Sequence, residues 1–344
     1  MSNRVFYVYT PPWVEWSAGT KVLHYFCDHL NKIGEDSYLA IHGPKSKNAE
    51  TNKELKTPVL DRKLLKQHEM ENRQVIAIYP EGVTGNPLRA QTVIRWLLNY
   101  TSLLGGQIKF SREEFVWAYS RNIAESYYSK TGKRAPIFFI PAVNVAEVES
   151  VPDNPIMHGN YEVLYAQKYR ALGGKPEVQS INNVIEITRF SSNSTTRAET
   201  LNLLKFAQAV HIFENTSIAT EAALFGVPVV CHKNELFDTL IAEHELGVDG
   251  FSWFPLSGTI VDPINARDKL QSAWSSVSGN LSSALSQIEF KPMNLTRQDK
   301  VCLPNRSVFS KHAFARANLL IRQKGLVVFG RFLINYVRRI FNQV

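Results

Sequence analysis

Short apolar runs alternate with amphipathic stretches and polar turns along the first half of the chain. The apolar runs predict strands over residues 5–9, 38–41, 75–79, 115–118 and 136–140. Helical spacing of apolar residues predicts helices over residues 21–32 and 88–99. Strands that alternate with helices are typical of a doubly wound α/β domain with a parallel sheet.

The same alternation restarts after residues 141–159, a segment with three prolines that we interpret as a linker. We predict strands over residues 161–166, 184–188, 209–213 and 227–230, and helices over 196–208, 217–225 and 266–288, the last broken at Gly279. At 344 residues the chain suits two domains. We place them at residues 1–155 and 156–310, followed by a tail of residues 311–344.

The net charge of +8 comes entirely from the end of the chain, because the last 45 residues hold nine basic residues and no acid. No nucleic-acid-binding motif is visible, so we do not expect a nucleic-acid partner. On a helical wheel the basic residues of the tail gather opposite its leucines. We interpret this basic amphipathic tail as a helix that lies on an anionic membrane or crosses back onto the N-terminal domain.

Cysteine usage indicates a reducing compartment. Cys27, Cys231 and Cys302 lie far apart, with neither a metal-ligand spacing nor the even count of a disulfide framework. The apolar run at the amino terminus is too short for a signal-peptide core. We therefore expect a cytoplasmic protein, peripherally associated with the inner face of the plasma membrane.

Residues 214–230 are the most informative segment of the second half. Thr216 and Ser217 can cap a helix that follows a buried strand, and Gly226 is placed to end that helix. Backbone N–H groups at such a helix start attract phosphate. Glu221, one turn later, is placed to accept a hydrogen bond from a ribose. The segment thus predicts a nucleotide-diphosphate site; the alternative is an ordinary strand–helix–strand unit with a solvent-facing acid.

This segment resembles the nucleotide-binding segment of GT-B glycosyltransferases, in which an acid, a Ser/Thr turn, a Glu-Ala helix and Gly-x-Pro-Val-Val follow in this order. The resemblance implies two Rossmann-like domains that face a cleft, with the nucleotide on the C-terminal one. It assigns the ribose to Glu221 and places Asn215, Thr216 and Ser217 at the donor. The best-known form of the family has seven residues between its two glutamates, but six separate Glu214 from Glu221, so the role of Glu214 stays open.

A second block runs Tyr-Pro-Glu-Gly-Val-Thr-Gly-Asn-Pro-Leu over residues 79–88 and continues to Arg95 and Trp96. It resembles a block of glycosyltransferases that assemble bacterial surface polysaccharides. Its glycines and prolines predict a shaped loop that presents Glu81 and Asn86. Glu81 is our first candidate for a base that deprotonates an acceptor hydroxyl. The alternative is that Glu81 caps backbone N–H groups of the loop.

Five further residues are candidates on weaker grounds. Lys168 and Arg170 follow the first strand of the second half, where GT-B enzymes often place cations that neutralise the leaving diphosphate; solvated surface charge is the alternative. Arg189 lies in a polar loop placed to contact the base or the pyrophosphate. Gly19 allows close backbone approach to the donor or acceptor. His24 is either a catalytic base or a packed helix residue.

These observations predict a glycosyltransferase of hexosyltransferase type. It would move a sugar from a nucleotide-diphosphate donor to a lipid-linked oligosaccharide of a surface polysaccharide, an O-antigen of lipopolysaccharide or a capsule, with other enzymes of that biosynthesis as partners. We expect no metal and no separate cofactor, because no Asp-x-Asp pair or Cys/His cluster occurs. Inversion and retention both stay open. The alternatives are a sugar-nucleotide epimerase or hydrolase on the same fold, and a non-catalytic sugar-binding protein.

Overall fold

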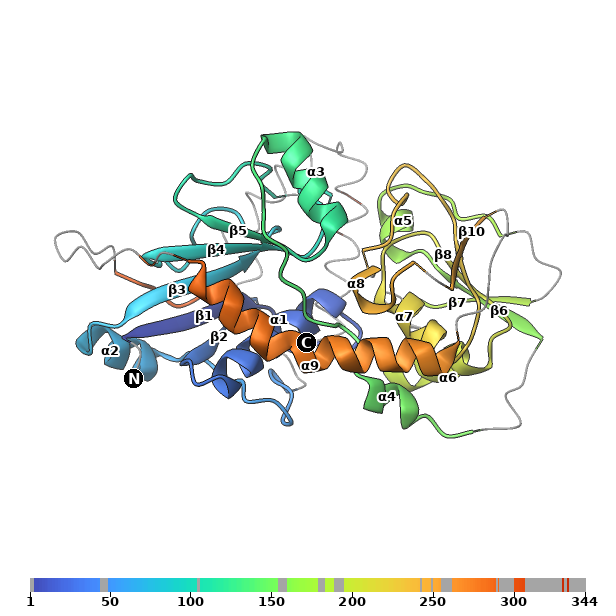
Figure 1. Ribbon diagram of the computed structural model, residues 1–344, viewed down its shortest axis with the longest axis horizontal. Coiled ribbons are helices and arrows are strands. Elements are labelled where there is room, and N and C mark those ends of the chain that lie inside the picture. Colours follow the sequence, from blue (N-terminus) through green and yellow to red (C-terminus); the bar gives the residue numbers. More distant parts are fainter. Residues whose placement is uncertain are drawn as a thin grey trace. The chain divides into compact units, whose positions relative to one another are not determined.

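The computed structural model describes two compact units, each built on a five-stranded parallel sheet (Figure 1). It describes residues 3–43, 49–103, 106–153, 160–178, 183–188, 195–241, 243–248, 250–254, 262–288, 290, 300–306, 330 and 333. The predicted α/β class, with a Rossmann-like sheet in each half, is confirmed.

The first unit has the sheet order β2-β1-β3-β4-β5. Its strands are buried over most of their length, as the apolar runs predicted. The elements in chain order are β1 (Arg4–Thr10), α1 (Ala18–Lys32), β2 (Ser37–Ile41), α2 (Arg62–Met70), β3 (Gln74–Pro80), β4 (Thr92–Leu97), β5 (Phe115–Ala118) and α3 (Arg121–Thr131).

The second unit has the sheet order β10-β9-β8-β6-β7. Its main core joins one face of the sheet to α4, α6, α7 and the start of α9. The elements are α4 (Val145–Glu149), β6 (Tyr161–Tyr165), α5 (Gln167–Ala171), β7 (Asn183–Glu186), α6 (Arg197–Phe206), β8 (Val210–Ile212), α7 (Ser217–Leu224), β9 (Val229–Cys231), α8 (Glu243–Leu246), β10 (Phe251–Trp253) and α9 (Pro263–Ser286).

The boundary between the units falls between Ile140 and Pro141, whereas the sequence prediction put it after residue 155. Residues 141–159 were interpreted as a linker, but this segment begins with α4, whose Val145 and Val148 are part of the core of the second unit. Toward the end of the chain, the described residues from 276 to 306 group with the first unit. Helix α9 runs through Gly279 without the predicted break.

The prediction of a helix over residues 88–99 is wrong. This stretch holds β4, which pairs with β3 and β5 and is buried at every position. Apolar spacing did not reveal this strand, because the charged residue Arg95 stands within it and is fully buried. Residues 136–140, predicted as a strand, make only an isolated bridge, between Ile137 and Ala118 at the end of β5.

The segment 300–306 returns to the first unit. Val301 is buried in its core, and the backbone N–H of Cys302 donates to the carbonyl oxygen of Leu88 at 3.0 Å. Arg306 forms an ion pair with Glu50. The basic tail, residues 311–344, lies outside the described residues apart from Gly330 and Leu333, so both interpretations of it stay predictions. In the parts of the chain that the structure describes, no helix combines the length and hydropathy that crossing a membrane requires.

Arg95 organises the loop that follows β3. Its guanidinium donates to Glu114 at 2.8 Å and to the carbonyl oxygens of Val83 and Gly85 at 2.8 and 2.9 Å. The same loop is held by Tyr79, whose hydroxyl donates to the side chain of Asn86 at 2.8 Å. A buried guanidinium is tolerated here because a carboxylate and two carbonyls satisfy it.

We expect Arg95→Met to lower the free energy of unfolding by about 3–5 kcal/mol, because the substitution leaves Glu114 and two loop carbonyls without their donor. Urea denaturation followed by circular dichroism would measure this loss. Arg112→Met is the control: Arg112 is exposed on the segment before β5 and should cost less than about 0.5 kcal/mol. Equal stability of the two variants would contradict the structural role of Arg95.

Candidate functional site

The predicted nucleotide segment lies at the carboxyl end of β8, the end of a parallel strand where ligands bind in such sheets. Thr216 adopts an extended conformation and caps α7, with its hydroxyl oxygen accepting a hydrogen bond from the backbone N–H of Ile218 at 3.3 Å. Ser217 is the first helical residue, and all eight residues of α7 are buried. The predicted cap and helix are therefore present, and the first turn of α7 has the N–H groups that favour a phosphate.

Glu214 has a role that the spacing of the two glutamates left open. Its carboxylate Oε2 accepts hydrogen bonds from the backbone N–H groups of Lys168 and Tyr169, the latter at 2.9 Å. It therefore caps the start of α5, where Ala166 at the cap position contributes no side-chain acceptor. A carboxylate suits this place, because helix N-termini carry partial positive charge.

Lys168 and Asn215 are joined to this cap. The ammonium Nζ of Lys168 donates to the backbone carbonyl of Asn215 at 2.6 Å and lies 3.4 Å from Oε1 of Glu214. The Asn215 side chain donates to the carbonyl of Thr239 at 3.0 Å and accepts from the N–H of Ile241 at 2.7 Å. The structure thus brings Lys168 to the start of α7, while the Asn215 amide holds the loop at residues 239–241.

Glu221 has no exposed surface. Its Oε2 accepts a hydrogen bond from Arg197 Nη1 at 2.8 Å, and Arg197 also binds Glu147 at 2.7 and 3.0 Å. The other carboxylate oxygen of Glu221, Oε1, has no hydrogen-bond partner among the described residues. A buried acceptor without a donor is costly, about 1–3 kcal/mol, so this oxygen is suited to receive a donor from a ligand.

Arg197 connects three helices, since it begins α6 and binds carboxylates on α7 and α4. Burial disfavours its charged form, but the charges of Glu221 and Glu147 and their hydrogen bonds outweigh this effect and raise the pKa of Arg197. The guanidinium therefore stays charged and compensates the buried Glu221.

The remaining predicted donor residues are dispersed. Arg170 forms an ion pair with Glu186 through two hydrogen bonds of 2.7 and 2.8 Å, and its side chain is 46% exposed. Arg189 lies outside the described residues. In the first unit, Gly19 stands in the first turn of α1, where an added Cβ would meet only Leu98 at 3.9 Å. Protein packing therefore does not require a glycine at position 19.

His24 is a packed residue in this structure. Its imidazole has no exposed surface, lies 3.2 Å from the carbonyl of Pro11 through Nε2, and meets Trp13 edge to face. Burial lowers the pKa of His24 to about 4, partly offset by the Pro11 carbonyl. The packed alternative fits these contacts better than a catalytic base does.

Glu81 follows β3 at the carboxyl end of the first sheet and is half-buried. Its Oε2 accepts a hydrogen bond at 3.0 Å from the backbone N–H of Leu98, the residue after β4. Glu81 thus binds a backbone N–H group, but this group follows the neighbouring strand and does not belong to the loop, as the capping alternative had it. Each carboxylate oxygen has two lone pairs, so a carboxylate that accepts hydrogen bonds can also accept a proton.

Sequence reasoning missed a chain of titratable groups on the sheet of the second unit. Glu162 on β6 binds His211 on β8 at 2.9 Å, and the other nitrogen of His211 lies 2.9 Å from His232, just after β9. Burial and the neighbouring His211 lower the pKa of His232 to about 4, so this imidazole is neutral at pH 7. The His232 ring stacks between Phe213 and Phe254.

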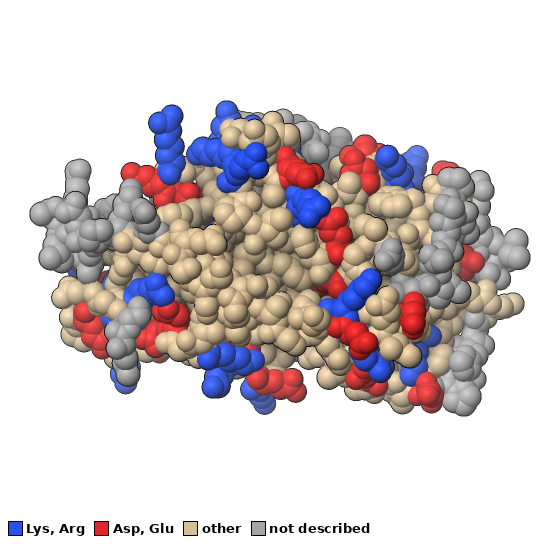
Figure 2. All heavy atoms as spheres, viewed as in Figure 1, with Lys and Arg blue, Asp and Glu red and all other residues tan. Residues whose placement is uncertain are grey.

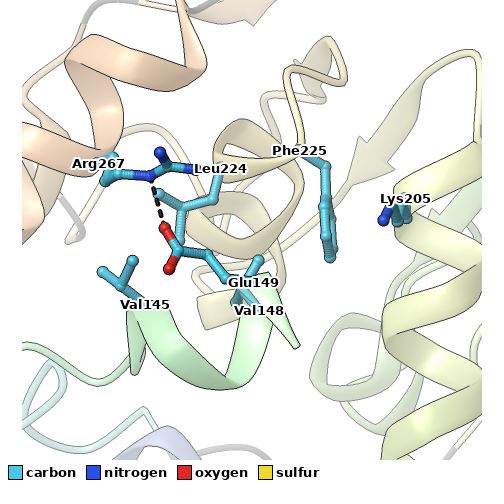
Figure 3. A pocket seen from close by; sticks show the side chains of 7 residues that line it. All are labelled: Val145, Val148, Glu149, Lys205, Leu224, Phe225 and Arg267. Carbon is cyan, nitrogen blue, oxygen red and sulfur yellow. Dashed lines mark ion pairs between the residues drawn. The ribbon is translucent and has the colours of Figure 1, made fainter. Parts of the chain in front are cut away.

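A cavity of about 350 Å³ lies elsewhere in the second unit, at the opposite end of α7 (Figure 3). Its charged groups are already engaged: Arg267 pairs with Glu149 at 2.6 Å, and Lys205 donates to the carbonyl of Val151 at 2.7 Å. A helix C-terminus disfavours anions, so this cavity does not suit a diphosphate. The lining residues are Val145, Val148, Glu149, Lys205, Leu224, Phe225 and Arg267.

Comparison of the sequence with protein-family models and with curated proteins finds no match. Similar solved structures include UDP-GlcNAc 2-epimerase from Methanocaldococcus jannaschii, at 11% identity and a TM-score of 0.37 over 82% of this chain and 99% of that chain. The glycosyltransferase SnogD from Streptomyces nogalater has 10% identity and a TM-score of 0.32, over 82% and 99%. The spinosyn rhamnosyltransferase SpnG has 12% identity and a TM-score of 0.36, over 83% and 96%. Likeness at this level does not by itself assign an activity to this chain.

Proposed function

We propose that this protein is a glycosyltransferase that takes a sugar from a nucleotide-diphosphate donor, bound at the start of α7. The observation that carries the proposal is the state of Glu221: a fully buried carboxylate, one turn after a capped helix start, with one oxygen that lacks a donor. A ribose hydroxyl is such a donor. The resemblance of residues 214–230 to the GT-B nucleotide segment points to the same assignment.

Donor binding then involves an exchange of partners at Glu221. The ribose hydroxyls replace Arg197 as donors to the carboxylate, and Arg197 keeps Glu147 as its counter-ion. This exchange keeps both groups hydrogen-bonded, because the ribose hydroxyls donate to the Glu221 carboxylate while Glu147 remains the counter-ion of Arg197. Arg197 is accordingly a competitor of the nucleotide, so its contact with Glu221 tunes donor affinity.

The leaving group is stabilised by fixed positive charge. When the sugar–phosphate bond breaks, negative charge develops on the nucleotide diphosphate. The N–H groups at the start of α7 offer partial positive charge at that place, and the ammonium of Lys168, held at the Asn215 carbonyl, adds a cation whose charge Glu214 at 3.4 Å partly offsets. Because both are held in position before the reaction, little reorganisation is needed during transfer.

Glu81 is the proposed base of an inverting transfer. Its hydrogen bond from Leu98 fixes the carboxylate on the end of the first sheet, and its other lone pairs can take the proton of an acceptor hydroxyl. The proposed acceptor is a lipid-linked oligosaccharide of a bacterial surface polysaccharide. That choice rests on the resemblance of residues 79–96 to glycosyltransferases of surface-glycan assembly.

The function is tested with a panel of nucleotide sugars. A glycosyltransferase should show selective thermal stabilisation by one donor, and should release nucleoside diphosphate faster when a lipid-linked acceptor is present. Consumption of the donor at the same rate without acceptor would indicate an epimerase or hydrolase. No stabilisation by any nucleotide sugar or nucleoside diphosphate would contradict the proposed donor site.

Glu221→Gln should weaken binding of the cognate nucleoside diphosphate by about 10- to 150-fold, since a charge-assisted hydrogen bond contributes roughly 1.5–3 kcal/mol. Isothermal titration calorimetry measures this affinity. Glu147→Gln is the comparison variant: it removes the other carboxylate of Arg197 and leaves α7 unchanged, so its effect on affinity reports the part that acts through Arg197. Equal effects of the two variants on affinity would mean that Glu221 acts only through Arg197.

Glu81→Gln should lower the rate of transfer by about 10²- to 10⁴-fold while leaving nucleotide affinity unchanged. The glutamine oxygen can still accept the hydrogen bond from Leu98, so the fold should be retained. Steady-state transfer assays beside calorimetry separate the two quantities. Glu125→Gln, an exposed acid on α3, is the control for the loss of one charge. Wild-type transfer by Glu81→Gln would remove Glu81 from the chemistry.

A further inference from the structure

The end of helix α3 in the first unit exposes large apolar side chains. Tyr128 on α3 is 50% exposed, and Ile137, nine residues later, is 44% exposed. Both stand on fixed backbone. Gly132 ends α3 in a left-handed conformation with its N–H donating to the Tyr128 carbonyl at 2.7 Å, and Ile137 lies in the bridge to the edge strand β5. The backbone at Tyr128 and Ile137 is therefore fixed by hydrogen bonds, although both side chains are exposed.

Basic residues lie beside Tyr128 and in the segment that leads to Ile137. The guanidinium of Arg134 lies 5.4 Å from the centre of the Tyr128 ring, and the ammonium of Lys130 donates to the Thr101 carbonyl at 3.2 Å. Lys130, Lys133 and Arg134 are all exposed. Figure 2 shows Lys and Arg side chains in this part of the molecule, with Asp and Glu side chains beside them. We call Tyr128, Lys130, Lys133, Arg134 and Ile137 the α3 surface.

The positive charge extends to the segment before β5. Phe110 stacks on Tyr127 of α3 at 6.1 Å, which brings the exposed Lys109 and Arg112 to the same helix. Within the described residues, Lys109, Arg112, Lys133 and Arg134 form no ion pair with a carboxylate. The acids near these cations in the chain are Glu113 and Glu125, both exposed, and Glu114, which is bound to Arg95. The surface therefore has an excess of positive charge available to a partner.

We propose that the α3 surface binds an anionic lipid bilayer. Tyrosine at the level of the headgroups, an aliphatic side chain beneath them and basic side chains at the lipid phosphates are the chemistry of a bilayer interface. A nucleic acid would use the cations but offers no apolar phase for Ile137. The contact belongs to folded elements and is separate from the basic tail that the sequence analysis singled out.

Binding to a bilayer would bring the protein to the lipid-linked acceptor of the proposed function. This link between membrane and acceptor rests on the proposed function, whereas the binding itself does not. A lipid-linked oligosaccharide lies at a bilayer surface. A domain that docks there through α3 would meet the acceptor at high local concentration. Vesicle binding is measured without any nucleotide, and nucleotide binding without any vesicle, so failure of one proposal is distinguishable from failure of the other.

Sedimentation of the full chain with vesicles tests the charge. The protein should bind vesicles of phosphatidylcholine with phosphatidylglycerol, release as salt rises, and bind pure phosphatidylcholine weakly. Lys133→Gln with Arg134→Gln should lower the partition coefficient about 30-fold, at about 1 kcal/mol for each basic residue. The control is Lys63→Gln with Lys66→Gln, an equal loss of charge from exposed positions on α2, which should leave binding unchanged. Equal losses for both pairs, or no vesicle binding at all, would overturn the proposal.

A site-specific probe separates the α3 surface from the tail. Ile137→Cys labelled with an environment-sensitive dye should brighten and shift to the blue on anionic vesicles, whereas the same dye at Met70→Cys, 77% exposed on α2, should not. Labelled wild type corrects for Cys27, Cys231 and Cys302. Sedimentation with vesicles but no change of the dye at position 137 would show that another part of the chain makes the contact.

Discussion

Backbone N–H groups just beyond the carboxyl ends of parallel strands have no partner within the sheet, and both units satisfy such groups with a glutamate. In the first unit Glu81, after β3, accepts from Leu98 after the neighbouring β4. In the second, Glu214, after β8, accepts from Lys168 and Tyr169 after the neighbouring β6. Each glutamate ties together two loops at the edge where such sheets bind ligands. The position of both candidate sites depends on these two contacts.

Much of the fold could be predicted because parallel strands are buried on both faces and read as apolar runs. The runs around Val5, Val75 and Val229 identified β1, β3 and β9 correctly. β4 was missed because the charged Arg95 interrupts its apolar run. Glu114, two carbonyls of the preceding loop and the rings of Tyr79 and Phe110 make a buried arginine acceptable, and a local pattern does not contain such long-range partners.

The candidate site, too, could be predicted only where short-range rules determine the structure. The cap at Thr216 and the helix it begins follow from short-range rules, and both are present. The pairing of Glu221 with Arg197 does not follow, because 24 residues and a strand separate them in the chain. The only local sign was that Arg197 directly follows Thr196, which forms a capping box with Glu199. That sign locates a helix start but not the partner of an arginine. In the second block, hydrogen bonds of Tyr79, Asn86 and Arg95 fix the conformation of the loop. Glu81 is then the residue of this block that is a candidate for catalysis.

The return of residues 300–306 to the first unit has a consequence for how the protein is made. Val301 completes a core whose other members lie between Val5 and Val93, and Cys302 binds the loop at Leu88. A ribosome must therefore translate all of Pro141–Ser275 before this unit receives its last segment. At about 5–20 residues per second, that interval is roughly 7–30 s. During this interval the second unit can already fold. The first unit, although its synthesis began earlier, still lacks Val301 and exposes part of its apolar surface, which chaperones can bind.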